Sequence, residues 1–355
     1  MKAKSKAKRS TAPASAPVTK RYRAARRPSG PERIVGLGCS AGGLEACEQF
    51  LTHLAPDTGL AFVLVSHLDP DRKGVMPELL QRCTRMKVCQ AEDGMKARPN
   101  CVYVIPPNVD LSILHGKFQL LEPSAPRGLR LPIDFFFKHL AQDQKERSVG
   151  IILSGMGTDG TQGLKAIKEG MGLVLAQDPA SAKYDGMPRS AIGTGLVDIV
   201  APAMDLPARL AGFVKHAGSL PHQAVAGEAE PSSALEKVFV LLRARTGTDF
   251  SAYKATTIHR RLERRLNVHQ LESLAHYVRY LQENPQELDL LFRELLIGVT
   301  SFFRDPAAYQ VLQEKAIPQL LESKAPGSPL RVWVPGCATG EEAYSVMLAL
   351  TECLD

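Results

Sequence analysis

Residues 33–43 read Arg-Ile-Val-Gly-Leu-Gly-Cys-Ser-Ala-Gly-Gly, a short apolar strand that runs into glycines, and helical spacing follows over residues 44–54. Residues 38–42 fit Gly-x-Ser-x-Gly in the strand–turn–helix setting that a nucleophile elbow requires. Such a turn exposes Ser40 at the end of the strand, and the next helix offers free N–H groups and a positive dipole to a developing anion. Turns of this kind also bind phosphates, so a phosphate- or nucleotide-binding protein is a second interpretation.

Further apolar strands alternate with helical segments downstream. Strands are predicted at 60–66, 101–105, 149–154 and 172–177, with helices at 75–82, 133–143 and 163–169. Strands that are apolar on both faces and alternate with helices are typical of a parallel sheet covered on both sides. We therefore predict an α/β fold with a doubly wound, mostly parallel sheet. Its catalytic residues should lie on loops at the carboxyl ends of the strands.

Two polar residues follow strands in the same way as Ser40. His67 follows the strand at 60–66, and Asp159 lies in Ser-Gly-Met-Gly-Thr-Asp-Gly (154–160) after the strand at 149–154. A serine nucleophile needs a base, and that imidazole needs a carboxylate to orient it. The order Ser…His…Asp differs from the Ser…Asp…His order of α/β-hydrolases. Cys39 is a weaker candidate nucleophile, because the Gly-x-Ser-x-Gly register puts serine at the apex.

Five motifs over residues 33–215 carry a resemblance to a known family. They are Gly-Cys-Ser-Ala-Gly-Gly, Val-Ser-His-Leu-Asp-Pro, Tyr-Val-Ile-Pro-Pro-Asn, Leu-Ser-Gly-Met-Gly-Thr-Asp-Gly and Met-Pro-Arg-Ser-Ala-Ile-Gly-Thr-Gly. In family order, they resemble the catalytic domain of the chemotaxis methylesterases (CheB-type). The resemblance implies a hydrolase that removes methyl esters from glutamate side chains of chemoreceptors, releases methanol and needs no cofactor. It implies Ser40 as nucleophile, His67 as base, Asp159 as orienting carboxylate, and backbone N–H groups of Ala41 and Met156 as the oxyanion hole.

Typical members of that family also carry a phosphoacceptor receiver domain before the catalytic domain. Only a basic tail precedes it in this sequence, so we expect constitutive esterase activity that small phosphodonors do not change. The commoner family loop has threonine where this chain has Ala41.

A second resemblance begins after a stretch rich in Gly, Pro and Ser at 218–233, which indicates a linker. Helical periodicity follows, and then come Ile-Gly-Val-Thr-Ser-Phe-Phe-Arg (297–304) and Arg-Val-Trp-Val-Pro-Gly-Cys-Ala-Thr-Gly-Glu-Glu-Ala-Tyr-Ser (331–345). Both resemble the chemotaxis receptor methyltransferases (CheR-type). Residues 234–325 are similar to the helical N-terminal domain of that family, and residues 326–355 to the first strand, turn and helix of its S-adenosylmethionine domain. By resemblance, Thr300, Arg304, Glu341 and Glu342 would contact the cofactor, although Gly298 replaces the asparagine usual in the family.

The chain is thus interpreted as an esterase–transferase fusion in which the cofactor domain is incomplete. We expect no S-adenosylmethionine binding and no receptor methylation by these residues alone, because ligand sites bury most of their ligand. S-adenosylmethionine would serve as a cofactor only in a complete transferase domain. Two alternatives are a signalling scaffold and a full fusion that also methylates receptor glutamates.

Basic residues concentrate at two places. Residues 1–31 carry ten Lys and Arg and no acidic residue, whereas the whole chain has a net charge of +7. The rest is therefore slightly acidic, and a tail so poor in apolar residues is predicted to be disordered over 1–32. The predicted helix at 258–268 carries His259, Arg260, Arg261, Arg264 and Arg265. It is either a solvated face or a surface that docks on an acidic partner.

The composition excludes several classes of protein. No window reaches the roughly 20 apolar residues of a membrane span, and no apolar signal-peptide core is present. The seven cysteines form no Cys-x-x-Cys pair, so neither a zinc ribbon nor a disulfide framework is expected, and no metal site is predicted. We expect a soluble, cytoplasmic protein without a transmembrane segment. Its predicted partners are methyl-accepting chemoreceptors or other methylated signalling proteins, together with chemosensory kinase-pathway proteins. Nucleic acid is not expected, because the tail has one aromatic residue for base stacking.

Overall fold

The computed structural model describes residues 30–67, 75–123, 125–126, 129–217, 233–297, 300, 302–325, 327–338 and 340–354. The predicted tail up to residue 29 and the predicted linker from 218 to 232 lie outside these ranges. Within them, no helix combines the length and apolar character needed to cross a membrane.

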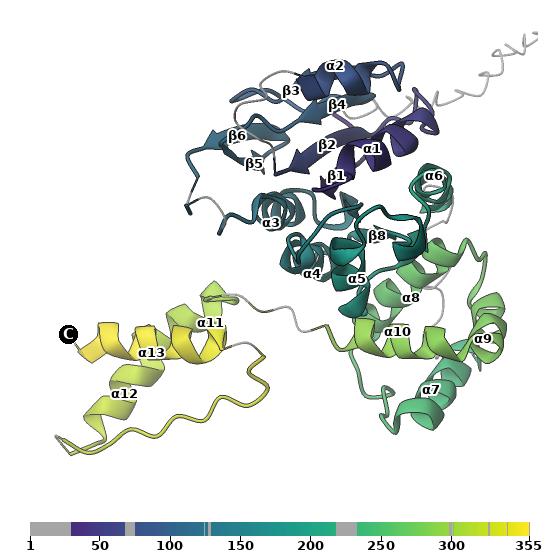
Figure 1. Cartoon of the computed structure of the whole chain (residues 1–355). Helices are drawn as coiled ribbons and strands as arrows, with labels where there is room; N and C mark the ends of the chain where they lie inside the picture. Colours follow the sequence, from purple (N-terminus) through teal and green to yellow (C-terminus); the bar gives the residue numbers. More distant parts are fainter. Residues whose placement is uncertain are drawn as a thin grey trace, which may run out of the picture.

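A seven-stranded sheet forms the centre of residues 30–217 (Figure 1). The strands are β1 (Ile34–Cys39), β2 (Ala61–Ser66), β3 (Lys87–Gln90), β4 (Cys101–Val104), β7 (Ser148–Ile152), β8 (Leu173–Gln177) and β9 (Ile199–Ala201). Their order is β3-β4-β2-β1-β7-β8-β9, and every neighbouring pair is parallel. Strands β1, β2, β7 and β8 are buried along their whole length, which explains their uninterrupted apolar sequences. The predicted mostly parallel α/β fold is confirmed.

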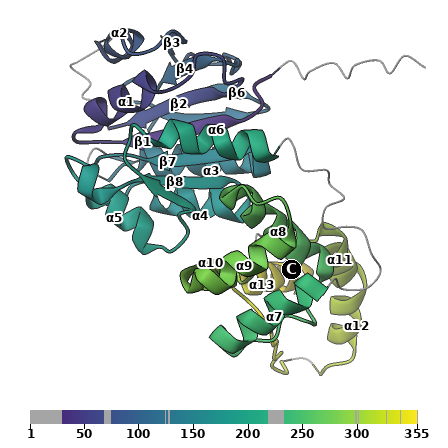
Figure 2. The ribbon, with the colours of Figure 1, turned by 90° about the vertical axis from the view of Figure 1, so that its right-hand side faces the viewer.

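Helices cover both faces of the sheet (Figure 2). They are α1 (Gly43–Thr52), α2 (Val75–Gln81), α3 (Pro132–Gln144), α4 (Thr161–Glu169), α5 (Gly186–Gly193) and α6 (Leu206–Ala217). One apolar core joins the sheet to α1 and α6 through Phe50 and Leu210, and the other joins it to α3 and α4 through Phe137 and Leu164. The sheet is therefore doubly wound, as predicted.

Some elements of the domain have weak sequence signals. The hairpin of β5 (Asp110–Leu114) and β6 (Lys117–Leu121) and the edge strands β3 and β9 were not predicted. The edge strand β3 is half exposed and β9 has three residues, so neither presents the apolar run that reveals a buried strand.

Helix α3 approaches β1 closely because β1 has two glycines on that face. A Cβ atom at Gly36 would lie 2.5 Å from Cε1 of Phe137, and one at Gly38 would lie 2.5 Å from Cγ2 of Ile133. Since Ile133 is in the first turn of α3 and faces the last part of β1, the helix begins at the carboxyl edge of the sheet. Its unpaired N-terminal N–H groups thus point to the edge where catalytic residues were predicted.

Residues 233–297 form a helical bundle with its own apolar core. Its helices are α7 (Ser233–Thr246), α8 (Ala255–His269), α9 (Leu274–Glu283) and α10 (Pro285–Leu295). Leu242, Leu262, Tyr277 and Leu291 are buried completely at its centre. This bundle is the part of the predicted helical domain that folds around a single core.

The following segment departs from the sequence prediction in two ways. Helices α11 (Pro306–Val311) and α12 (Ile317–Glu322) share a small core with α13 (Glu341–Leu354), not with the bundle. The predicted strand at 331–334 is wrong, since these residues have no regular secondary structure and Trp333 is 87% exposed. An apolar run becomes a strand only where a neighbouring strand pairs with it.

The basic helix α8 is neither a solvated face nor a free docking surface, so both interpretations of it are corrected. Arg264 and Arg265 are buried and bind carboxylates, and Arg261 is buried beside them, whereas Arg260 is exposed. Arg264 donates to Asp198 (2.5 Å) and Glu294 (2.9 Å), and it also donates to the carbonyl of Gly172 (2.6 Å). The basic face of α8 is covered by the α/β domain of the same chain.

We call this group the ionic joint: Lys168, Asp198, Arg261, Arg264, Arg265, Glu287 and Glu294. Asp198 is its centre, because it pairs with Lys168 of α4 and with two arginines of α8. Its carboxylate also accepts the N–H of Val174 (3.0 Å) near the beginning of β8. The bundle therefore docks at the amino ends of the strands, on the edge opposite the carboxyl ends.

The cations of the joint keep its carboxylates charged. Burial alone would raise the pKa of Asp198, but Arg264 and Lys168 hold it well below its usual range. Burial alone would also raise the pKa of Glu287, but hydrogen bonds and charge from His269 and Arg265 lower it to about 2. Because these folded pKa values lie below the unfolded ones, the carboxylates stabilise the fold at neutral pH. Their contribution decreases as the pH falls below about 4 toward the folded values.

Replacement of the central carboxylate tests the joint. We expect Asp198→Asn to lower the free energy of unfolding by about 3–5 kcal/mol, because it leaves buried cations without a partner. Asp289→Asn is the matched control, since Asp289 pairs with Arg245 at an exposed position on α10, where an ion pair contributes little. Urea denaturation measures both variants, and equal losses would contradict the assigned role of Asp198.

Candidate active site

The pairing of β1 brings the predicted site segments to one edge of the sheet. Cys39 is paired with Ser66 in the parallel register of β1 and β2, so Ser40 and His67 are the next residues on neighbouring strands. On the other side of β1, the N–H of Ser40 donates to the carbonyl of Ser154 (3.0 Å), just past β7. Ser40 therefore lies between the segment that ends in His67 and the loop that leads to Asp159.

The turn after Ser40 has the geometry of a tight strand-to-helix connection. Gly42 has a φ of 68°, a conformation that glycine adopts without strain. The N–H of Gly43 donates to the carbonyl of Ser40 (2.9 Å), and a Cβ at Gly43 would lie 2.7 Å from Sγ of Cys39. Ser40 is half-buried at this turn, whereas Cys39 is 1% exposed and its sulfur lies 3.7 Å from that of Cys47. The Cys39 thiol points into the core, which argues against a thiol nucleophile.

His67 and Asp159 form a pair at the same edge. Nε2 of His67 lies 3.2 Å from Oδ2 of Asp159, and the histidine side chain is 37% exposed against 4% for the aspartate. Such an imidazole can meet an incoming substrate while its carboxylate partner stays out of water.

The beginning of α3 holds Asp159 in place. Its two carboxylate oxygens accept the N–H groups of Ile133 (3.0 Å) and Asp134 (2.9 Å), both in the first turn of α3. These donors have no partner within the helix, and the helix dipole favours negative charge there. The glycines of β1 that admit α3 thus also fix the carboxylate behind His67.

The hydrogen bond with Asp159 raises the pKa of His67 above its ordinary value, although burial acts in the opposite direction. Among the described residues, no hydrogen bond joins Ser40 to His67, and strand pairing alone connects them. Bonds between a nucleophile and its base are often long before substrate binds.

The loop of residues 154–160 completes the surroundings of Ser40. A Cβ at Gly155 would lie 2.1 Å from Sδ of Met187 and 3.1 Å from Cβ of Ser40, so only glycine lets the loop touch the serine. Met156 is 62% exposed at the front of this loop. In the described part of the chain, the N–H groups of Ala41 and Met156 donate no hydrogen bond to protein, so both are available to an oxyanion.

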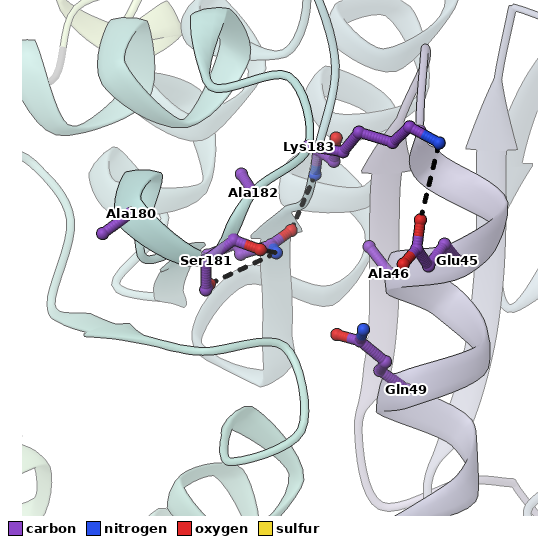
Figure 3. A pocket seen from close by; sticks show the side chains of 10 residues that line it. Glu45, Ala46, Gln49, Ala180, Ser181, Ala182 and Lys183 are labelled. Carbon is purple, nitrogen blue, oxygen red and sulfur yellow. Dashed lines mark hydrogen bonds and ion pairs between the residues drawn. The ribbon is translucent and has the colours of Figure 1, made fainter.

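A polar cavity of about 370 Å³ adjoins the turn (Figure 3). It is lined by Gly42, by the face of α1 with Glu45 and Gln49, and by Ser154, Gln177 and residues 180–183. Lys183 and Glu45 face each other across the cavity at 3.8 Å. The cavity shares Gly42 and Ser154 with the site, but none of the three predicted catalytic residues lines it.

Of the predicted cofactor residues, Glu341 and Glu342 lie on α13, and Arg304 follows a residue that is bonded to this helix. The N–H of Phe303 donates to Oγ of Ser345 (2.9 Å), which brings the chain beside Arg304 to the second turn of α13. Glu341 and Glu342 begin that helix after Gly340, whose φ is 108°. A hydroxyl at Thr300, an arginine and two carboxylates on a glycine turn are chemically suited to the ribose and amino-acid groups of S-adenosylmethionine.

Comparison with known families divides the chain into three matched regions. The model of the family described as CheB methylesterase matches residues 35–210. The CheR methyltransferase all-alpha domain matches residues 233–296, and the CheR methyltransferase SAM binding domain matches residues 298–355.

Individual relatives agree with these matches. A putative protein-glutamate methylesterase/protein-glutamine glutaminase of Leptospira interrogans is 36% identical over 170 residues, which are 48% of this chain and 88% of that protein. The "Uncharacterized 104.1 kDa protein in hypE 3'region" of Rhodobacter capsulatus is 38% identical over 301 residues, or 79% of this chain and 32% of that protein. The protein-glutamate methylesterase/protein-glutamine glutaminase of Moorella thermoacetica is 35% identical over 190 residues, or 52% of this chain and 45% of that protein. The chain thus spans about a third of the Rhodobacter protein and less than half of the Moorella protein.

Among solved structures, the Thermotoga maritima CheB methylesterase catalytic domain has 31% sequence identity and a TM-score of 0.48. That alignment covers 52% of this chain and 98% of the other.

The pair of His67 and Asp159 can be tested by titration. We expect the imidazole of His67 to titrate above the value of about 6.5 for an unperturbed histidine, and Asp159→Asn to lower this pKa. Asp143→Asn is the matched control, because Asp143 also accepts two backbone N–H groups but on the β5–β6 hairpin. Histidine NMR measures the pKa of His67, and equal pKa values in the wild type and in Asp159→Asn would contradict the coupling.

Proposed function

Because the chain belongs to the CheB methylesterase family and continues into CheR methyltransferase domains, we propose that residues 30–217 hydrolyse glutamate methyl esters of signalling proteins. The observation that carries this proposal is the His67–Asp159 pair at 3.2 Å, in which His67 follows β2 at the position next to Ser40, the residue that follows β1. A serine, a base and an orienting carboxylate at one sheet edge are the groups that ester hydrolysis by an acyl-enzyme requires.

In the proposed reaction, Oγ of Ser40 attacks the ester carbonyl while His67 accepts the serine proton. The carboxylate of Asp159 stabilises the imidazolium that forms. The N–H groups of Ala41 and Met156 would bind the oxyanion of the tetrahedral intermediate. His67 then protonates the methoxide as it leaves, which gives methanol and an acyl ester on Ser40. Water, activated by His67, hydrolyses that ester and returns the glutamate.

The substrates and partners are proposed from the same chemistry. Methyl-accepting chemoreceptors or other methylated signalling proteins would present the esters, in the cytoplasm and beside proteins of a chemosensory kinase pathway. Relatives that carry the name protein-glutamine glutaminase suggest that a glutamine side chain could enter the same site. There the acyl-enzyme would form in the same way, with ammonia as the leaving group.

The C-terminal segment supports a second, coarser proposal. Its match to a SAM binding domain suggests that Thr300, Arg304, Glu341 and Glu342 contribute to a site for S-adenosylmethionine, which would supply a methyl group. The carboxylates would face the polar groups of the cofactor, and Arg304 its carboxylate.

Methanol release from methylated receptor membranes tests the esterase proposal. We expect Ser40→Ala and His67→Ala each to reduce the rate by roughly 10⁴-fold or more, and the double variant to lose little beyond that, because the residues act as a unit. Ser323→Ala is the control, since its hydroxyl also bonds a carbonyl, that of Leu320 (2.8 Å), but at the end of α12.

Retention of the wild-type rate by Ser40→Ala would refute the proposal. Phosphate affinity that is the same in the wild type and in Ser40→Ala, together with no methanol release by either, would instead favour a phosphate-binding turn.

A further inference from the structure

Ser154 lies where the loops around Ser40 meet, and no step of the proposed reaction uses its hydroxyl. It follows β7 by two residues and its side chain is 1% exposed. Its carbonyl accepts the N–H of Ser40 (3.0 Å), which continues the β1–β7 pairing beyond the ends of both strands.

The hydroxyl of Ser154 contacts the same turn on the other side of Ser40. Oγ accepts the N–H of Tyr184 (3.0 Å), and the carbonyl oxygens of Ala41 (3.0 Å) and Tyr184 (3.3 Å) are both within reach of its single proton, with that of Ala41 the nearer. One residue therefore binds the N–H of Ser40 and the carbonyl of Ala41. The peptide N–H proposed for the oxyanion hole lies between these two bonds.

Ser154 is itself held from the next strand. The side-chain oxygen of Gln177 accepts its N–H (2.9 Å), and the amide nitrogen of Gln177 donates to the carbonyl of Ser181 (3.1 Å). Gln177 is the last residue of β8 and is 1% exposed. Ser181, which receives these bonds, lies at the wall of the cavity (Figure 3).

Ser154 packs tightly against the turn that follows Ser40. A Cβ at Gly42 would lie 2.8 Å from Oγ of Ser154, so the hydroxyl occupies the space beside the turn. Interiors packed at this density transmit small displacements to their neighbours. A change at Ser154 should therefore shift Ser40 and Ala41, although it touches no reacting atom.

We propose that Ser154, anchored by Gln177, is a positioning residue that sets the nucleophile turn by bonding it on both sides of Ser40. The proposal rests on the proposed esterase function, since it concerns the reactivity of that serine. Loss of the hydroxyl frees the carbonyl of Ala41 and removes the acceptor of the Tyr184 N–H. Ser40 and the Ala41 N–H would then sample orientations that do not suit attack.

The experiment compares Ser154→Ala with Ser148→Ala. Ser148 is a matched control because it is also buried, at 0% exposed, and bonds a carbonyl, that of Lys145, but it lies at the end of β7 that is far from Ser154. A fluorophosphonate probe reports the reactivity of Ser40 independently of the natural substrate. We expect labelling to slow by roughly 10- to 100-fold in Ser154→Ala, the range that misplacement of a reacting group produces. Ser148→Ala should keep the wild-type rate.

Two further readouts separate positioning from simple destabilisation. With an ester substrate, Ser154→Ala should lower kcat and leave KM and the midpoint of the pH–rate profile unchanged, because the His67–Asp159 pair is untouched. The melting temperatures of the two variants should be similar. If Ser154→Ala fails to fold, Gln177→Met decides, since it removes the anchor but keeps the hydroxyl and should also slow labelling.

Normal labelling of the wild type, with equal rates in Ser154→Ala and Ser148→Ala, would overturn this inference and leave the esterase proposal intact. An unchanged labelling rate in Gln177→Met would overturn the assigned anchor. A wild type that neither reacts with the probe nor hydrolyses the ester would instead overturn the proposed function, and this inference with it.

Discussion

Parallel pairing on both sides of β1 is the constraint on which the proposed site depends. The register that places Cys39 beside Ser66 puts Ser40 and His67 at neighbouring positions, and the pairing with β7 leads directly to the Ser40–Ser154 bond. Side chains alternate between faces along a strand, so a slip of one residue would send Ser40 to the other face. Two glycines of β1 add to this constraint, because they admit α3 so closely that its first N–H groups reach Asp159.

The ionic joint holds the helical bundle against the opposite edge of the sheet. Four buried cations face three buried carboxylates there, and Nε and Nη1 of Arg261 have no hydrogen-bond partner among the described residues. A joint of this kind is costly to break, because each charge has already lost its water. It attaches the helical bundle at the amino ends of the strands, whereas the proposed catalytic residues lie at the carboxyl ends. The bundle therefore lies away from the edge where the proposed catalytic residues lie.

Long-range polar contacts explain why sequence reasoning missed parts of the site. The hydroxyl of Ser154 bonds a carbonyl 113 positions away, and Gln177 bonds Ser154 from the next strand. Their targets are backbone groups, which every residue carries, so no motif marks them in advance. The arginines of α8 are a second case, because their sequence pattern is also that of a solvated helix face. Only the position of Asp198 beside them in the folded chain shows that they are buried. The run at 331–334 has strand-like residues, yet no described strand pairs with it.

The sequence was sufficient, through its apolar periodicity, to predict the alternation of buried strands and helices, and hence a parallel α/β sheet with polar residues after its strands. It also contained Ser40, His67 and Asp159 as the candidates for one edge, because period and turn chemistry are local properties of the chain. Three features became known only from the folded chain. They are the strands that flank β1, the contact of Asp159 with the beginning of α3, and the burial of α8 against Asp198. These features depend on register, close approach through glycine and charge pairing between distant segments, and such interactions exist only once the chain has folded.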